Sequence, residues 1–179
     1  MNVLLAPRLW RMLILPILAF VALACLTADR ALILVLNIVQ FGLAMAVVVA
    51  FAPEAWRILT GARPMTRGSW MAYGIWLSWG AVVWRTSESL IWRFLGQPPW
   101  LINSDVTSAY LFFGCLGAAA HIIRPGELGD RIPAPEQIRI GLIIGTLAAL
   151  GLMAVYAPEI GALIHGAPVH GDLPRGVVG

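Results

Sequence analysis

The chain has 179 residues, of which 60% are hydrophobic and only 12% are charged. Soluble domains carry about 25% charged residues, so this composition argues against an ordinary soluble domain and favours an integral membrane protein. The net charge of +3 is small and the basic residues are scattered along the chain, which argues against nucleic-acid binding.

Five apolar segments alternate with short polar ones along the chain. A hydrocarbon core about 30 Å thick needs roughly 20 apolar residues as a helix, and each segment approaches that length. The sequence therefore predicts a single all-α membrane domain over residues 1–179, a bundle of five transmembrane helices with no soluble domain; four spans are the alternative. The expected spans are residues 12–28, 31–52, 69–88, 106–123 and 138–156, followed by a polar C-terminal tail at 157–179.

The first segment has two interpretations. Arg8 and Arg11 precede a long apolar run, which is the order found in a secretory signal peptide, and Leu26–Ala28 offers a weak cleavage site. Cleavage would leave no mature soluble N-terminus, because the next apolar run begins at Ala31. We favour an uncleaved span that forms a tight hairpin with the second one.

The second segment is expected to end at Pro53, because proline cannot continue the hydrogen-bond ladder of a helix. Its polar residues Asn37 and Gln40 are three positions apart and therefore share one face. We interpret them as a hydrogen-bonding seam between helices, worth roughly 0.6–2 kcal/mol per contact. The alternative is that they line a permeation path.

Tryptophan marks the third segment and its surroundings, since six of the eight tryptophans lie between residues 70 and 100. Ser69 is the expected N-cap, and helical character can continue to Phe94. For Trp76 and Trp79, which lie deeper, helix packing or lipid contact is favoured over ligand stacking. Tryptophans near the ends of a span are typical interfacial anchors, because indole is apolar with one polar N–H. The expected anchors are Trp70, Trp84, Trp92 and Trp100.

Arg85 and Glu88 follow the third segment as i,i+3 neighbours. Ionisable residues inside a membrane are costly and indicate a functional site by default. On a straight helix, however, Arg85 lies about 22 Å from Trp70, close to the opposite interface. We therefore expect an interfacial amphipathic extension. The alternative is that this pair lines a pore or substrate path together with Asn37 and Gln40.

The last two segments carry small residues four positions apart. Such spacing lets helix backbones approach closely in lipid, where no hydrophobic force drives helices together. The pattern predicts close packing, either within one chain or between copies. The candidate packing residues are Gly114 and Ala118 in the fourth segment, and Gly141, Gly145 and Ala149 in the fifth.

Arginine placement predicts the orientation, because cytoplasmic segments carry an excess of basic residues. We expect a bacterial cytoplasmic (inner) membrane location with the N-terminus inside and the C-terminus outside. This orientation places inside Arg8, Arg11, Arg57, Arg63, Arg67, Arg124, Arg131 and Arg139, and outside Arg30, Arg85, Arg93 and Arg175.

No catalytic, cofactor-binding or metal-ligating set is expected. The sequence has no CxxC, GxSxG, HExxH, P-loop or dinucleotide pattern. His121 is the only histidine within a span, so histidine cannot supply both axial ligands of a haem in one chain. His165 and His170 fit a solvated tail better than a metal site. Cys25 and Cys115 are expected to be inert buried thiols.

These features favour a small non-enzymatic membrane protein that acts through helix packing, as an accessory or scaffolding subunit of a membrane complex. Its expected partners are the lipid bilayer and further copies or other membrane subunits, with no nucleic acid. The alternative is an oligomeric pore or membrane permeabiliser, comparable to phage holins in size and architecture. A cofactor-bearing enzyme subunit is a distant third.

Overall fold

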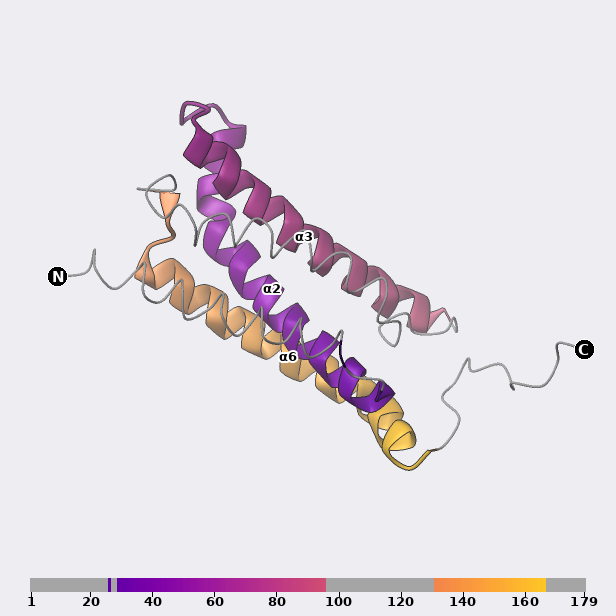
Figure 1. The fold of residues 1–179 in the computed structure, drawn as a ribbon. Coiled ribbons are helices and arrows are strands. Elements are labelled where there is room, and N and C mark those ends of the chain that lie inside the picture. Colours follow the sequence, from indigo (N-terminus) through magenta and orange to yellow (C-terminus); the bar gives the residue numbers. More distant parts are fainter. Residues whose placement is uncertain (1–25, 27–28, 96–130, 167–179) are drawn as a thin grey trace, which may run out of the picture.

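The computed structural model describes residues 26, 29–95 and 131–166, and the structural statements below concern these residues. They form three α-helices and no strand: α2 (Arg30–Leu59), α3 (Arg67–Phe94) and α6 (Pro135–Ile164). α2 packs along both of the other helices, as Figure 1 shows. The predicted all-α class is confirmed for these residues. The predicted spans at 12–28 and 106–123, with Gly114 and Ala118, lie outside them.

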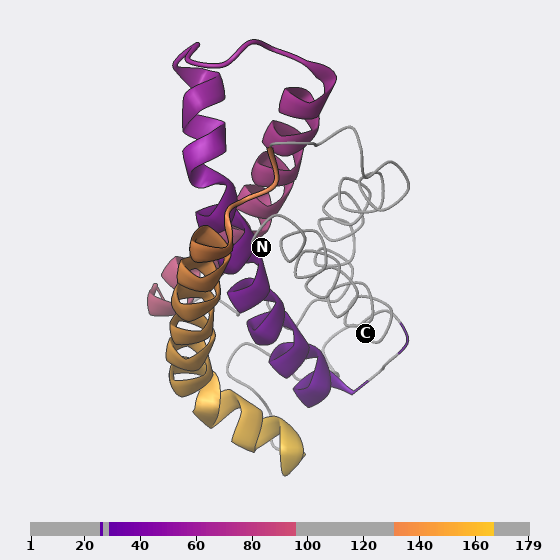
Figure 2. The ribbon, with the colours of Figure 1, turned by 90° about the vertical axis from the view of Figure 1, so that its left-hand side faces the viewer.

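α2 begins at a capped end and continues past the expected stop. The Asp29 carboxylate accepts hydrogen bonds from the backbone N–H groups of Ala31 (2.8 Å) and Leu32 (3.1 Å), as an N-cap does. The expectation that the helix ends at Pro53 is wrong, because α2 continues to Leu59 with this proline inside it. A proline inside a helix removes one hydrogen bond and bends the axis. Figure 2 shows α2 changing direction in its C-terminal part.

α3 extends to Phe94, which confirms the predicted continuation beyond the third apolar segment. Its N-cap differs from the expected one. The Thr66 hydroxyl accepts a hydrogen bond from the Ser69 backbone N–H at 3.3 Å, so Thr66 has the capping role expected of Ser69. Ser69 lies instead in the first turn of the helix, and it is fully buried. Its hydroxyl is therefore available for a contact with another part of the chain.

α6 is longer at both ends than the predicted fifth span. The helix continues into the segment predicted as a polar tail, because α6 extends to Ile164 with Pro158 inside it. Residues 157–164 are apolar apart from Glu159, and no glycine cap or run of polar residues interrupts them. The helix stops before Gly166, whose φ of 68° is in the left-handed region that glycine adopts readily at helix C-termini.

α2 and α3 each bury a stripe of residues three or four positions apart. The apolar middle of the two stripes forms one cluster, in which Trp79 is the largest fully buried side chain. Polar residues occur toward both ends of each stripe. The two helices run antiparallel (Figure 1), so the N-terminal polar residues of the α2 stripe and the C-terminal polar residues of the α3 stripe lie toward the same end of the pair. The stripes are Asn37, Gln40, Ala44, Val47, Phe51, Glu54 and Ile58 on α2, and Ser69, Ala72, Ile75, Trp79, Val82, Thr86 and Ser89 on α3.

α6 has two unlike faces. One face packs against α2 through a cluster that includes Leu152 and Tyr156. The other face exposes large aliphatic side chains such as Ile143, Leu147 and Leu150, with Leu147 63% exposed. Among the described helices, α2 and α6 are long and apolar enough to cross a membrane. The structure supports the membrane prediction to that extent, and the count of five spans stays a prediction.

Candidate functional site

A buried glutamate surrounded by arginines lies at one end of the bundle. Glu54, in the last turns of α2, has a side chain only 9% exposed. Its Oε1 lies 3.6 Å from Arg131 Nε. Its Oε2 lies 3.6 Å from Arg63 Nε and 3.7 Å from Arg57 Nη1. One carboxylate is thus shared by α2, the α2–α3 turn and the segment before α6.

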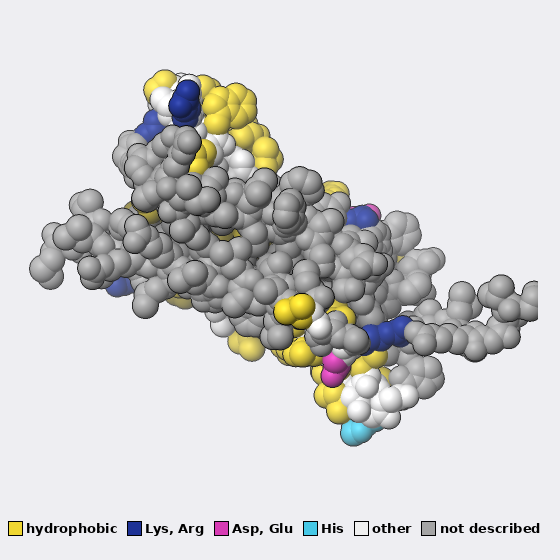
Figure 3. All heavy atoms as spheres, viewed as in Figure 1, with side chains coloured by type: hydrophobic (Ala, Val, Ile, Leu, Met, Phe, Trp, Pro, Cys, Tyr) yellow, Lys and Arg dark blue, Asp and Glu magenta, His cyan; other side chains and the backbone are white. Residues whose placement is uncertain are grey.

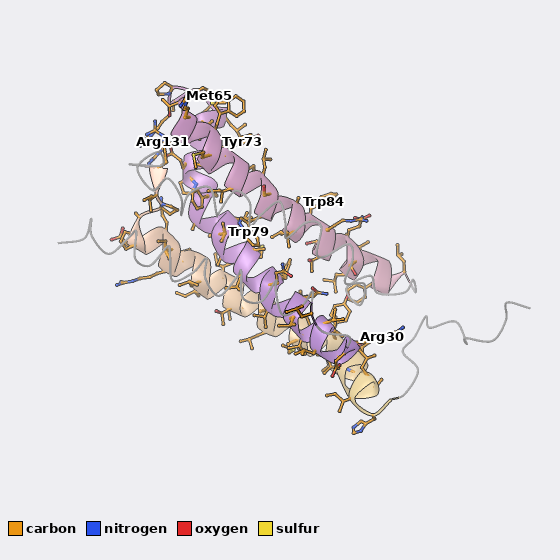
Figure 4. All side chains as sticks on the ribbon, viewed as in Figure 1. Arg30, Met65, Tyr73, Trp79, Trp84 and Arg131 are labelled. Carbon is orange, nitrogen blue, oxygen red and sulfur yellow. The ribbon has the colours of Figure 1, made fainter. Side chains whose placement is uncertain are left out.

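Arg131 is the member of this cluster that ties the three helices together. Its Nε donates to Ser69 Oγ at 3.2 Å, and its Nη2 donates to Thr66 Oγ1 at 3.4 Å. Ser69 Oγ donates in turn to the carbonyl of Pro64 at 3.0 Å. Figure 4 shows Arg131 at the same end of the bundle as Met65, which lies in the α2–α3 turn. The Glu54–Arg131 contact therefore fixes the start of α3 relative to the end of α2.

The cluster is more positive at its surface than in its interior. A buried carboxylate is tolerated when it is paired, and Arg131, whose side chain is 11% exposed, is the partner at Oε1. Arg57 is 53% exposed and reaches solvent. Arg67 is exposed in the first turn of α3, which contains no acidic residue to offset the positive end of the helix dipole.

The sequence contains a partial signal for this cluster. Val47, Phe51, Glu54 and Ile58 follow each other at spacings of three and four, which puts the carboxylate on the same face as buried apolar residues. A carboxylate at such a position requires a cationic partner. The identity of that partner is not readable from a local pattern, because Arg131 lies far along the chain.

The predicted polar residues of α2 are buried, with Asn37 and Gln40 almost inaccessible to solvent. They continue the buried stripe of α2 in the N-terminal direction, and Thr86 and Ser89 are buried in the C-terminal half of α3. Gln40 Nε2 and Ser89 Oγ are buried and have no hydrogen-bond partner in the described part of the chain. For Gln40 Nε2, the described residues therefore do not supply the interhelical hydrogen bond that the sequence predicts, and the seam stays a prediction.

Arg85 and Glu88 form an ion pair within α3. Each side chain is 29% exposed, which is intermediate between a solvated pair and a fully buried one. The two residues are one helical turn apart, so this ion pair is made within a single helix.

The predicted tryptophans divide into exposed and buried ones. Trp70 and Trp84 are exposed, as membrane-interface anchors would be, and Figure 4 shows Trp84 pointing away from α2. Trp79 is buried in the cluster between α2 and α3, which is a packing role. The side chain of Trp92 and all of Trp100 lie outside the described residues.

The predicted packing residues of α6 lie against α2 at backbone-contact distance. A Cβ atom added to Gly145 would overlap the carbonyl oxygen of Gly42, and one added to Gly141 would overlap that of Ala46. In the reverse direction, a Cβ on Gly42 would lie 2.8 Å from Ala149 Cβ. Gly42 and Ala46 have the same four-residue spacing as their partners, so the sequence carries this signal on both helices.

Comparison with known proteins gives no relative from which a function can be transferred, since no family model, curated protein or solved structure matches the chain. Within the described ranges, no group of three histidine, cysteine, aspartate or glutamate side chains is arranged to hold a metal ion. The functional inference therefore rests on the helix contacts and on the distribution of charge.

Proposed function

We propose that this protein is a polytopic membrane protein of the bacterial cytoplasmic membrane that serves as a scaffolding or accessory subunit of a membrane complex. The observation that carries the proposal is the contrast between the two faces of α6. One face is in backbone contact with α2 through Gly141 and Gly145, and the other is an exposed aliphatic row that includes Ile143, Leu147 and Leu150.

A lipid environment accounts for both faces at once. An exposed aliphatic row of this size is a liability in water, whereas in lipid it is surrounded by chemically similar material. Helix association in lipid depends on van der Waals contact between backbones, which the small residues of α2 and α6 provide. The result is a rigid helix pair with an aliphatic outer face, against which a helix of another subunit can pack.

The distribution of charge supports the proposed orientation. Five arginines and two glutamates lie at the Glu54 end of the described helices, whereas arginines and acidic residues are balanced at the opposite end. The positive-inside bias then favours the Glu54 end in the cytoplasm. The first set is Arg57, Arg63, Arg67, Arg131 and Arg139 with Glu54 and Glu136; the second is Arg30, Arg85 and Arg93 with Asp29, Glu88 and Glu159.

Fusion reporters test this orientation directly. A reporter after Gly179 should be active only on the outer side, and one inserted between Gly126 and Gln137 only on the inner side. Opposite results at both points would reverse the orientation and remove one span from the predicted topology. Resistance of the protein to alkaline carbonate extraction tests membrane integration separately.

The scaffolding proposal is tested by photo-crosslinking in native membranes. A photoreactive residue at Leu147 should give one defined protein adduct, and the same protein should co-purify in fixed ratio in mild detergent. The matched control is Val47, which is buried between α2 and α3 and should give no intermolecular adduct. Lipid adducts alone at Ile143, Leu147 and Leu150 would contradict the scaffolding role while leaving membrane integration intact.

A pore is the second candidate, and the polar ends of the α2 and α3 stripes favour it. Buried Gln40 Nε2 and Ser89 Oγ have no partner in the described part of the chain. A cavity of about 280 Å³ lies close to this region, lined mainly by apolar residues with Thr86 and Ser87 among them. A pore predicts ion leakage from liposomes that Gln40→Leu abolishes, whereas a scaffold leaves the liposomes tight.

A further inference from the structure

We propose that a cavity between α2, α3 and α6 binds one acyl chain of a membrane phospholipid. The cavity has a volume of about 280 Å³. All three helices line it, through Phe41 of α2, Leu90 of α3, and Gly151, Leu152 and Val155 of α6 among others. The inference rests on the proposed membrane location and adds to it a site for a ligand of defined chemistry.

The first step is the origin of the space, which is a missing side chain on α6. A Cβ atom added to Gly151 would meet nothing within 4 Å, whereas one added to Gly145 would overlap the backbone of α2. Gly145 therefore allows close packing, and Gly151 leaves room. Phe41 and Leu152, which line the cavity, belong to one buried cluster, and Leu90 of α3 packs against the same cluster. The cavity thus has a packed wall on all three helices.

The second step is the chemistry of the wall, which disfavours water. A buried water typically makes about three hydrogen bonds. Thr86 and Ser87 are the only lining residues with a polar side chain. The Ser87 hydroxyl already donates to the carbonyl of Val83 at 2.8 Å. Cavities with apolar walls stay dry and take up apolar molecules, so this wall favours hydrocarbon.

The third step is depth. Phe41 lies about 5 Å from the middle of α2 along its axis, and the lining residues of α6 lie within about 9 Å of the middle of that helix. These are the two described helices that are long and apolar enough to cross a membrane. Figure 3 shows hydrophobic side chains where α6 reaches the surface. Since the hydrocarbon core extends about 15 Å to each side of its centre, acyl chains are the molecules that reach the cavity.

The fourth step is shape, which separates an acyl chain from a helix of another subunit. The lining of α6 runs from Ala148 to Val155, about 10 Å along the helix axis, and that of α3 from Thr86 to Leu90, about 6 Å. A cavity of about 280 Å³ spread over this length is too narrow for a helix, which with its side chains is about 10–12 Å wide. A linear hydrocarbon chain is narrow and flexible enough to lie along it.

The test uses the purified full-length protein in detergent and a phospholipid with a photoreactive group in the middle of one acyl chain. Labelling should saturate as this lipid is added, and peptide mapping should place the adducts on lining residues such as Leu90 and Val155. Labelling that rises without saturation and spreads over the exposed faces of α3 and α6 would overturn the inference, because the lipid layer around any membrane protein behaves in that way. This arm uses the wild type and does not depend on the folding of a variant.

Gly151→Leu tests whether the cavity itself is the site. The new side chain should fill the cavity without displacing α2, since a Cβ at this position meets nothing within 4 Å. Burial of one methylene strengthens binding by about four-fold, and a leucine side chain takes the place of at least two. The lipid concentration that gives half-maximal labelling should therefore rise by about ten-fold or more.

Gly161→Leu is the matched control. Gly161 lies on the same helix and outside the lining of the cavity, and a Cβ there also meets nothing within 4 Å. This variant should be labelled as the wild type is. Equal weakening in the two variants, or no weakening in Gly151→Leu, would overturn the assignment of the site to this cavity.

Carbonate extraction distinguishes a failure of this inference from a failure of the proposed function. A protein that resists extraction but gives labelling without saturation has no bound acyl chain, while its membrane location stands. Release of the protein by carbonate would contradict the membrane location itself.

Discussion

α2 contacts its two neighbours in opposite ways. Against α6 it presents Gly42 and Ala46, and the contact is backbone against backbone. Against α3 it presents large side chains such as Phe51, which pack with Trp79, and it ends in the polar Glu54 cluster. The first contact can be disrupted by adding atoms and the second by removing them, which gives each interface its own diagnostic substitutions.

The largest effect is expected from Gly145→Leu at the α2–α6 contact. The new side chain would overlap the Gly42 carbonyl, and a backbone group cannot move aside as a side chain can. We expect a loss of stability above the roughly 1–3 kcal/mol typical of overpacking, measured by thermal unfolding in detergent. Gly151→Leu is the matched control, since a Cβ there meets nothing within 4 Å. Equal melting temperatures for both variants would show that the α2–α6 contact does not form.

The next effect is expected from Trp79→Ala at the α2–α3 contact. Removing the largest fully buried side chain leaves a cavity, and we expect a loss of about 3 kcal/mol. This is the lower end of the usual range, because lipid is itself apolar. The control is Trp84→Ala on the exposed face of α3, which should cost far less. Comparable losses for the two variants would mean that α3 presents a different face to α2.

The two contacts also differ in how far the sequence predicts them. The spacing of Gly141 and Gly145 is local information, and small residues at that spacing have few structural uses in an apolar helix. The Glu54 cluster depends on residues that are distant along the chain, because Arg131 and Ser69 are separated by 62 positions. Only the requirement for a cationic partner is readable from the position of Glu54 on the buried face of α2.

A local rule also misplaced one helix end, and a second proline departs from the same rule. Pro53 and Pro158 both lie inside helices, although proline disfavours that position. In each case apolar residues continue beyond the proline, and the longer helix keeps them in one continuous element. The consequence at Pro53 bears on the candidate site, because the added turns of α2 carry Glu54 and Arg57. Helix packing thus outweighed a local preference at the position that matters most for the candidate site.

A smaller effect is expected from Glu54→Gln, which removes the anion from the polar end of the α2–α3 contact. Loss of one partner of a buried ion pair costs roughly 3–5 kcal/mol. We expect about 2 kcal/mol here, because Arg57 and Arg63 can turn toward water. Adding Arg131→Gln should recover part of the loss, since no buried cation then lacks its partner. Strictly additive losses in this double-mutant cycle would contradict direct coupling between Glu54 and Arg131.

The smallest effect is expected from Glu88→Gln, which keeps the side-chain shape and removes the charge. Arg85 and Glu88 pair within one helix and are both partly exposed, so either can reach water when the other is neutralised. Pairs of this kind contribute about 0–1 kcal/mol, and the thermal unfolding of Glu88→Gln in detergent should stay close to wild type. Because Glu54 is more buried and is shared by three segments, its neutralisation should cost clearly more than that of Glu88. If Glu88→Gln instead prevents folding, and adding Arg85→Gln restores it, the pair lines a buried polar path and the pore becomes the favoured function.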